Sequence, residues 1–153
     1  MAEYSANAVQ TVAQNSTVIF TDSPVPCNRG LIRHRDESGS FLLRGYVARS
    51  SCGCCPQSAE YLAQFSANIA IPEGGTVEAV SLALAIDGAV IPSSTMIVTP
   101  AAVNEFFNIS VAVNAQIWRG CCETLSVINT STQPVLVQNA NIVISRPDLN
   151  VTR

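Results

Sequence analysis

The feature that most constrains this chain is a strict alternation of apolar and polar residues over two long segments. In residues 61–71 every second side chain is apolar, and Gln64, Ser66 and Asn68 lie between them. Residues 107–117 repeat the pattern, and the positions between their apolar side chains are Asn108, Ser110, Ala112, Asn114 and Gln116. Successive side chains of a strand point to opposite faces, so this period of two predicts two long strands, each with one buried face.

Shorter segments of the same kind extend the pattern along most of the chain. They predict strands at residues 17–21, 30–35, 41–46, 80–86, 125–129 and 135–145. In the last of these the apolar positions change parity near Asn139, which predicts a β-bulge there. Asp87-Gly88 is typical of a tight hairpin turn, and residues 100–105 suggest one helical turn. About eight to ten antiparallel strands separated by turns predict an all-β sandwich of the jelly-roll kind.

The length of 153 residues fits one domain. We expect residues 1–15 to form an N-terminal arm or a first strand. We expect the sandwich to cover residues 16–147, with a cysteine-rich insertion at 50–57, and a C-terminal tail at 148–153. Residues 2–14 are poor in large apolar side chains, so we expect them to become ordered only against a neighbouring subunit or surface.

Charged residues make up 12% of the chain, about half the usual share. Eight arginines and no lysine oppose eleven acidic residues, so nothing indicates nucleic-acid binding, which needs a basic excess. No apolar run is long enough to predict a membrane-spanning helix. A neutral polar surface is cheaper to desolvate than a charged one, which favours a subunit covered by other subunits. The alternative is a monomer with a neutral polar coat.

Six cysteines are the candidates for disulfide bonds: Cys27, Cys52, Cys54, Cys55, Cys121 and Cys122. Residues 1–13 show no secretory signal, which indicates synthesis in a cytosol, where thiols normally stay reduced. A particle that is assembled in a cell and released by lysis reconciles these facts. We expect at least one of Cys52, Cys54 and Cys55 to pair with Cys121 or Cys122. Free thiols are one alternative and a zinc site another, although the C-x-C-C spacing does not match usual zinc sites.

The sequence predicts no catalytic, cofactor-binding or metal-binding residues. A nucleophilic cysteine needs a base, and the only histidine, His34, lies among polar residues in a predicted strand. The acidic residues Asp36, Glu37 and Asp87 fall in predicted turns, where carboxylates favour local hydrogen bonds to the backbone. We therefore expect a protein that is not an enzyme and needs no cofactor.

Residues 61–146 resemble the trimeric jelly rolls of the tumour-necrosis-factor-like class. The resemblance rests on YLAQFSANIAIP (61–72), SLALAIDGAVIPSSTMIVTP (81–100), FFNISVAVNAQI (106–117), LSVINTS (125–131) and VQNANIVISR (137–146). It is strongest to bacteriophage virion proteins and to the heads of collagen-like proteins of bacterial spore surfaces. The resemblance implies a homotrimer whose closing strand lies near the threefold axis. Together with the polar strand faces, it makes these residues candidates for the trimer interface: Gln64, Ser66, Asn108, Ser110, Asn114 and Gln116.

The chain departs from the spore-surface proteins because it has no collagen-like Gly-X-Y stalk. The resemblance therefore implies a structural virion protein, such as a capsid decoration or head-fibre subunit of a bacteriophage. Such a protein is made in the bacterial host cytoplasm, is located in the virion and binds a viral shell or another surface lattice protein. The alternatives are a surface adhesin or carbohydrate-binding head, or a spore-surface subunit at a bacterial or spore surface. An exposed aromatic residue beside carboxylates in a cleft would favour a carbohydrate as partner.

Overall fold

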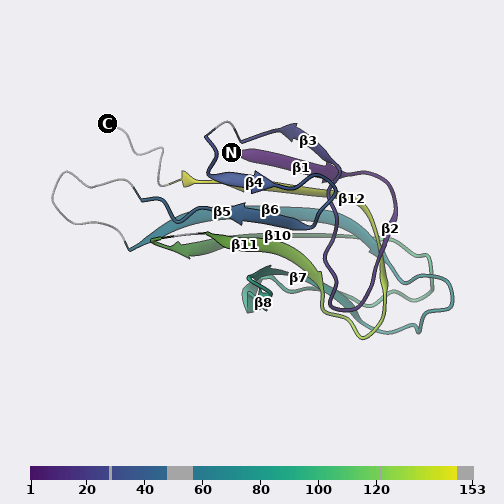
Figure 1. The fold of residues 1–153 in the computed structure, drawn as a ribbon. Coiled ribbons are helices and arrows are strands. Elements are labelled where there is room, and N and C mark those ends of the chain that lie inside the picture. The colour runs from purple at the N-terminus through teal and green to yellow at the C-terminus, as the bar shows by residue number, and fades with distance from the viewer. Residues whose placement is uncertain (28, 48–56, 121, 148–153) are drawn as a thin grey trace.

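The computed structural model describes residues 1–27, 29–47, 57–120 and 122–147. These residues form twelve strands and one short 3₁₀ helix, η1 (Pro92–Ser94). The strands build two antiparallel sheets that pack face to face, which confirms the predicted jelly-roll sandwich (Figure 1). No described helix is long and apolar enough to cross a membrane.

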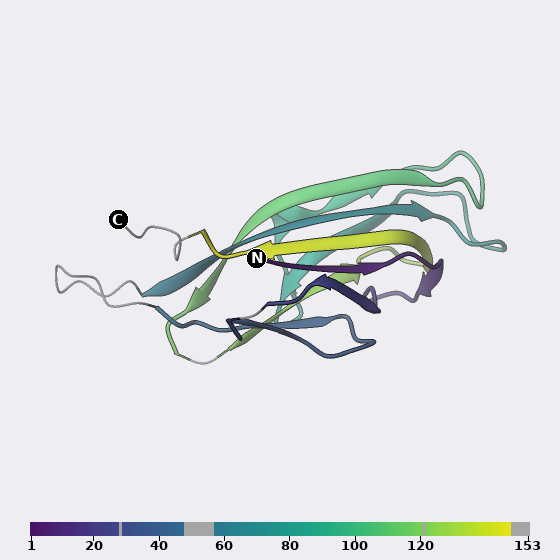
Figure 2. The ribbon, with the colours of Figure 1, turned by 90° about the horizontal axis from the view of Figure 1, so that it is seen from above.

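The first sheet has the strand order β10-β6-β12-β1-β3. These strands are β10 (Phe107–Trp118), β6 (Ser58–Ala70), β12 (Val135–Ser145), β1 (Ala2–Ala6) and β3 (Asp22–Val25). The short strand β2 (Gln10–Val12) also pairs with β12. Seen from above, β10, β6, β12 and β1 run side by side as one long layer (Figure 2).

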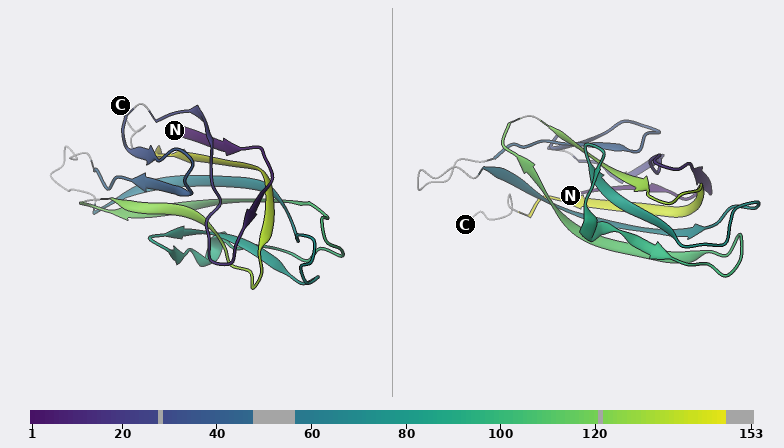
Figure 3. Two further views of the ribbon diagram at one scale, coloured as in Figure 1. Left: turned by 45° about the vertical axis from the view of Figure 1, so that its right-hand side comes forward. Right: turned by 90° about the horizontal axis from the view of Figure 1, so that it is seen from below.

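The second sheet has the strand order β4-β5-β11-β7-β8. These strands are β4 (Ile32–His34), β5 (Ser40–Leu43), β11 (Glu123–Asn129), β7 (Val80–Ile86) and β8 (Ala89–Val90), and β9 (Met96–Val98) pairs with β7. The oblique views show this sheet covering one side of the long layer (Figure 3). Asp87 and Gly88 both have positive φ between β7 and β8, which confirms the predicted hairpin turn.

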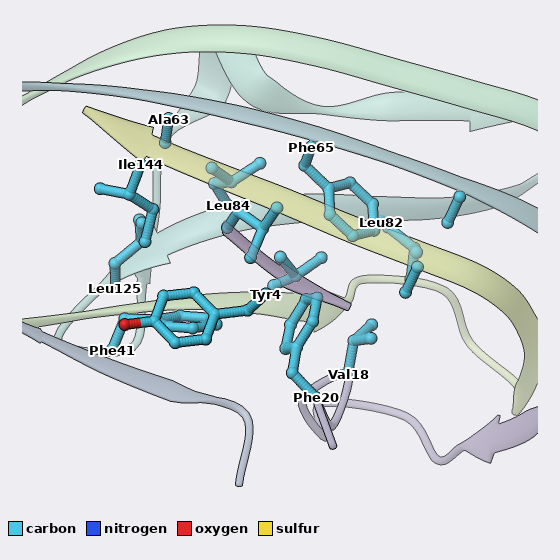
Figure 4. Close-up of a cluster of buried hydrophobic side chains, with 14 of the residues drawn as sticks. Tyr4, Val18, Phe20, Phe41, Ala63, Phe65, Leu82, Leu84, Leu125 and Ile144 are labelled. Carbon is cyan, nitrogen blue, oxygen red and sulfur yellow. The ribbon is translucent and has the colours of Figure 1, made fainter. Parts of the chain in front are cut away.

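The core lies between the two sheets. Apolar side chains from both sheets meet there, and Phe20, Phe41 and Phe65 form its aromatic centre (Figure 4). The ring of Phe20 contacts those of Phe41 and Phe65, with centroids 5.1 and 6.5 Å apart. Such aromatic pairs add about 0.5–1.5 kcal/mol each beyond the burial of their apolar area.

The two long alternating segments form the most regular part of the molecule. β10 pairs with β6 without interruption from Phe107 opposite Ile69 to Trp118 opposite Ser58. In β12 the pairing with β6 shifts by one residue between Gln138 and Asn141, which confirms the predicted bulge. Asn139 takes a positive φ of 51° there, so Ala140, Ile142 and Ile144 return to the core.

Of the two alternatives for residues 1–15, the structure shows the first strand. β1 lies between β12 and β3, and Ala2, Tyr4 and Ala6 are buried. The Tyr4 ring packs 4.8 Å from Phe41, centroid to centroid. The expectation that residues 2–14 become ordered only against a neighbour is therefore wrong for β1. Its apolar residues are few, but the ring of Tyr4 and the methyl groups of Ala2 and Ala6 fill the space over the core.

Residues 17–21 do not form the predicted strand. Val18 and Phe20 are buried as the alternation requires. The backbone of this segment, however, changes its hydrogen-bond partners from one sheet to the other. The Val18 amide donates to the Val127 carbonyl in the second sheet, and the Thr21 amide donates to the Ser5 carbonyl in the first. The segment therefore crosses between the two sheets, and the strand begins only at Asp22.

The predicted helical turn at residues 100–105 is also wrong. Asn104 has a φ of 57°, and its amide donates to the Ile71 carbonyl at 2.8 Å, in place of a helical bond. The Glu105 carboxylate accepts from the Ala101 amide at 3.1 Å and holds the loop closed. The short helix η1 begins instead at Pro92, where the fixed φ of proline suits a first helical position.

Candidate binding surfaces

Three neighbouring strands of the first sheet, β10 at its edge and β6 and β12 beside it, present an outward side without charge over part of their length. We call this surface the neutral face, and we define it by the outward residues of three paired strands. They are Asn108, Ser110 and Ala112 on β10; Leu62, Gln64, Ser66 and Asn68 on β6; and Leu136, Gln138, Asn141 and Val143 on β12. All are small, amide-bearing or aliphatic.

The strand register aligns these residues in rows across the sheet. Ser110 lies opposite Ser66, which lies opposite Asn141. The next row runs from Ala112 through Gln64 to Val143. An open hollow of about 450 Å³ lies over these two rows, lined mainly by Gln64, Ser66, Ser110, Ala112, Asn141 and Val143. No long side chain rises from the middle of this surface, which leaves room for the close approach of another protein.

Two contacts at the margins tie part of the neutral face together. The side-chain amide of Asn108 donates to Asn68 Oδ1 at 3.1 Å, and that of Asn141 donates to Glu3 Oε1 at 2.8 Å. In the described part of the chain, Gln64, Ser66 and Ser110 make no side-chain hydrogen bond. The centre of the face thus keeps neutral donors and acceptors for a partner.

The structure places all six predicted interface residues on the outward side of β6 and β10. Gln64, Ser66, Asn108 and Ser110 lie on the neutral face. Asn114 and Gln116 lie further along β10 and line a different surface. Their role in a trimer interface stays a prediction.

That second surface, which we call the edge groove, has a volume of about 640 Å³. It opens where β10, the edge strand of the first sheet, faces the end of the second sheet. Its polar lining is Glu60, Asn114, Gln116 and Glu123; its apolar lining is Trp118, Ile86, Ala89, Ile91 and Ala115. The pairing of Gln116 with Glu60 brings a carboxylate beside the outward side of β10.

Trp118 is the most unusual residue of the edge groove, because 63% of its surface is exposed. It ends β10, so its indole stands at the side of the sandwich and not over the neutral face. In the described residues, the side chains of Glu60, Asn114, Gln116 and Glu123 make no hydrogen bond or ion pair. The groove therefore combines an exposed aromatic surface with four polar groups that lack internal partners.

The carboxylates give the edge groove a negative character. Burial raises the pKa of Glu123 above its ordinary value, and the nearby Asp87 carboxylate raises it further. Asp87 is fixed in the β7–β8 turn, where its Oδ1 accepts from the Thr124 amide at 2.7 Å. Glu123 is thus held near a second negative charge that cannot turn away.

The predicted disulfide partners fall mostly outside the described residues: Cys52, Cys54, Cys55 and Cys121. No disulfide is present in the described part, where Cys27 is a free thiol and Cys122 is half-buried. Burial opposes ionisation of Cys27, but backbone amides of Ile32, Arg29 and Leu31 bond to its sulfur, so its pKa is lowered. Within the same residues no group of three or more His, Cys, Asp or Glu is placed to hold a metal ion.

Asn114 and Gln116 were expected from the sequence only as trimer-interface residues, and the two carboxylates of the edge groove were not found. Glu60 and Glu123 lie far apart in the chain, and neither falls in a recognisable motif. The one available signal was the pairing of the two long strands, which puts position 60 opposite position 116. Trp118 directly follows the second alternating segment, residues 107–117, and its place at a strand end was the signal that the sequence offered for it.

No protein-family model matches this chain, and no curated protein is significantly similar to it. Among solved structures, the chain is similar to an Eiger tumour necrosis factor from S. frugiperda. That likeness has a TM-score of 0.61 at 10% identity and covers 95% of this chain and 90% of the other. It shows that the fold is a jelly roll of the tumour-necrosis-factor type.

Two further likenesses have TM-scores below 0.5 and carry no argument. The globular domain of zebrafish complement 1qA has a TM-score of 0.49 at 10% identity, covering 93% of this chain and 94% of that one. A family 35 carbohydrate binding module from an environmental isolate has a TM-score of 0.39 at 14% identity, covering 95% and 97% of the two chains.

Proposed function

We propose that this jelly roll of the tumour-necrosis-factor type assembles as a homotrimer and acts by binding, without a catalytic step, as a surface-exposed structural head. The observation that carries the proposal is the neutral face. An exposed sheet face of a monomer normally mixes charges of both signs to remain soluble. The neighbouring strands β6, β10 and β12 carry no charge on their outward side between residues 62 and 68, 108 and 112, and 136 and 143.

The residue types of the neutral face lower the cost of burying it against a partner. Burying an ion against a partner costs far more than burying a hydroxyl or an amide that finds a hydrogen bond. Ser66, Ser110 and Gln64 offer such groups in the centre, and Leu62 and Val143 add apolar area. An open surface of these uncharged residues suits a protein partner better than a small ligand.

A closed ring of three subunits needs a second surface, because each subunit meets its two neighbours through different patches. The open edge next to the neutral face supplies one. Ile97 on β9 is 64% exposed and Phe107 on β10 is 37% exposed, and both lie away from the edge groove. These apolar side chains lose their contact with water if the edge of one subunit packs on the neutral face of the next.

The proposal also covers where such a trimer is located and what it binds. The sequence resemblance supports the outside of a bacteriophage capsid, with a viral shell or other surface lattice protein as partner and the virion as location. The second candidate, an adhesin or carbohydrate-binding head at a bacterial surface, is favoured by the edge groove, where an exposed tryptophan lies beside carboxylates.

Light scattering at micromolar concentration tests the assembly. We expect a mass about three times that of the 16.2 kDa chain, with more than about 1,000 Å² buried at each contact. A monomer mass at this concentration would refute the trimer. Cryo-electron microscopy of intact particles tests the setting separately, since a trimer that is absent from virions leaves only the cell-surface alternatives.

A further inference from the structure

We propose that the edge groove is a binding site for a sugar residue that carries no acid group. This inference rests on the second candidate function above and names its ligand class; it does not depend on the trimer, because it concerns the side of the sandwich and not the neutral face. It rests on three properties of the groove: an exposed indole, unpaired polar groups around it, and the sign of its charge.

The indole of Trp118 is the first property. The indole is 63% exposed and, together with the apolar residues that line the same groove, forms an apolar surface open to a ligand. The C–H groups of a sugar ring form an apolar patch that fits the flat face of an indole. Ile86 and Ile91 add apolar area to the same groove, so that a ring stacked on Trp118 has contacts beyond it.

The polar lining is the second property. Glu60 and Glu123 are acceptors for hydroxyl hydrogens, while Asn114 and Gln116 each offer both a donor and an acceptor. None of these four side chains is engaged with another described residue. Neighbouring hydroxyls of a sugar present alternating donors and acceptors at its edge, which matches this set. The volume of about 640 Å³ lies within the range of small-molecule sites, about 300–1,000 Å³.

Charge selects the class of sugar and is the third property. Glu60 and Glu123 line the groove, and Asp87 lies close enough to disfavour ionisation of Glu123. Arg119 follows Trp118 in the chain but lines a different hollow, together with Tyr46 and Gly120. A uronic or sialic acid would bring a further negative charge to these carboxylates, and like charges in one site reduce affinity. A neutral hexose or an N-acetylated hexosamine brings none.

Trp118 is the only tryptophan of the chain, so its fluorescence reports on this site alone. Titration of the intact protein with cellotetraose, mannotetraose and N-acetylchitotetraose should shift the emission to shorter wavelength with at least one of them. Tetragalacturonic acid should give no shift at the same concentration. The absence of a shift with all three neutral tetramers overturns the proposal, as does stronger binding of the acidic one.

Calorimetry with variants then assigns the binding to the groove. Trp118→Ala should weaken the binding of the responding tetramer at least tenfold, and Glu60→Gln should weaken it severalfold. Tyr46→Ala is the matched control, because Tyr46 is 60% exposed and lies outside the groove, so its affinity should stay unchanged. Equal losses in Trp118→Ala and Tyr46→Ala would overturn the site.

Two further measurements test the sugar site independently of the proposed trimer. The Trp118→Ala protein should keep the mass of the parent protein, so a loss of sugar binding cannot be ascribed to dissociation. Without sugar, the emission should be that of an exposed indole and be quenched by acrylamide. A buried indole in the unliganded trimer would mean that a neighbouring subunit fills the groove, and would overturn the sugar site while leaving the trimer intact.

Discussion

The neutral face and the edge groove both include β10, yet they differ in shape and in chemistry. The neutral face lies where β10, β6 and β12 are fully paired, and its side chains are short and uncharged. The edge groove lies at the end of β10, beside residues of the second sheet, and it contains Trp118, Glu60 and Glu123. One strand thus contributes to an uncharged surface along part of its length and to an aromatic, acidic groove at its end.

The difference shows how a sandwich separates two kinds of binding. In the middle of a sheet the backbone groups are satisfied and the side chains stand in regular rows, which gives a surface that another protein can cover. At the edge, the gap between the sheets admits a smaller ligand, and large or charged side chains there do not disturb the rows. Protein contact and small-ligand contact can therefore be altered by different substitutions.

The largest expected effect comes from a charge placed in the centre of the neutral face. Ser66→Arg puts a guanidinium between Ser110 and Asn141, and the nearest carboxylate across the sheet, Glu3 on β1, already accepts from the Asn141 side-chain amide. Burying it unpaired costs several kcal/mol at each contact, so the mass measured by light scattering should fall from three chains to one.

The control for this substitution is Ser40→Arg, at an exposed strand position of the second sheet. It adds the same side chain and charge but should leave the mass unchanged. A trimer that survives Ser66→Arg, with its circular dichroism unaltered, would place the subunit contact elsewhere and remove the basis of the comparison.

The sequence allowed the neutral face to be predicted but not the edge groove. Gln64, Ser66, Asn108 and Ser110 occupy alternate positions of long strands, and strand periodicity is enough to place them on one side. Glu60 and Glu123 come from different sheets, so only the packing of the two layers brings them near Trp118.

Short elements were harder to predict for a related reason. The five residues of β1 carry too little periodicity to distinguish a core strand from an arm, and only the burial of Tyr4 decides between them. Residues 17–21 have the alternation of a strand but exchange hydrogen-bond partners between the sheets, which no pattern of side chains reveals.

The next largest effect concerns the core that supports both surfaces. Tyr4 is 4% exposed and packs against the rings of Phe41 and His34. Tyr4→Ala should lower the free energy of unfolding by about 3–5 kcal/mol, as for other buried aromatic residues. Chemical denaturation monitored by circular dichroism measures it, with exposed Tyr46→Ala expected to change it by less than about 0.5 kcal/mol. A small loss for Tyr4→Ala would show that β1 is an arm after all.

A smaller effect is expected at the bulge that bounds the neutral face. Asn139 has a φ of 51°, and the extra residue keeps Asn141 and Val143 on the outward side. Asn139→Val should cost about 1–2 kcal/mol, because a left-handed backbone is unfavourable for a β-branched residue, whereas Asn139→Gly should be nearly neutral. Denaturation of the two variants in parallel checks the difference. Equal stability would mean that the bulge does not require this conformation.

The smallest effect belongs to the edge groove and depends on pH. Burial and the Asp87 carboxylate raise the pKa of Glu123 in the folded protein above its unfolded value. The folded state then binds this proton more tightly than the unfolded state, so ionisation of Glu123 lowers stability as pH rises from about 4.3 through the raised pKa.

Glu123→Gln cannot ionise and should be slightly more stable than the parent protein at pH 7 but not at pH 4. Thermal unfolding at both values measures the difference, with the exposed Glu73→Gln as a control for net charge. A destabilised Glu123→Gln at pH 7 would show that the Glu123 carboxylate makes a favourable contact in the groove, and the groove would then lack the surplus of negative charge on which its discrimination against acidic sugars depends.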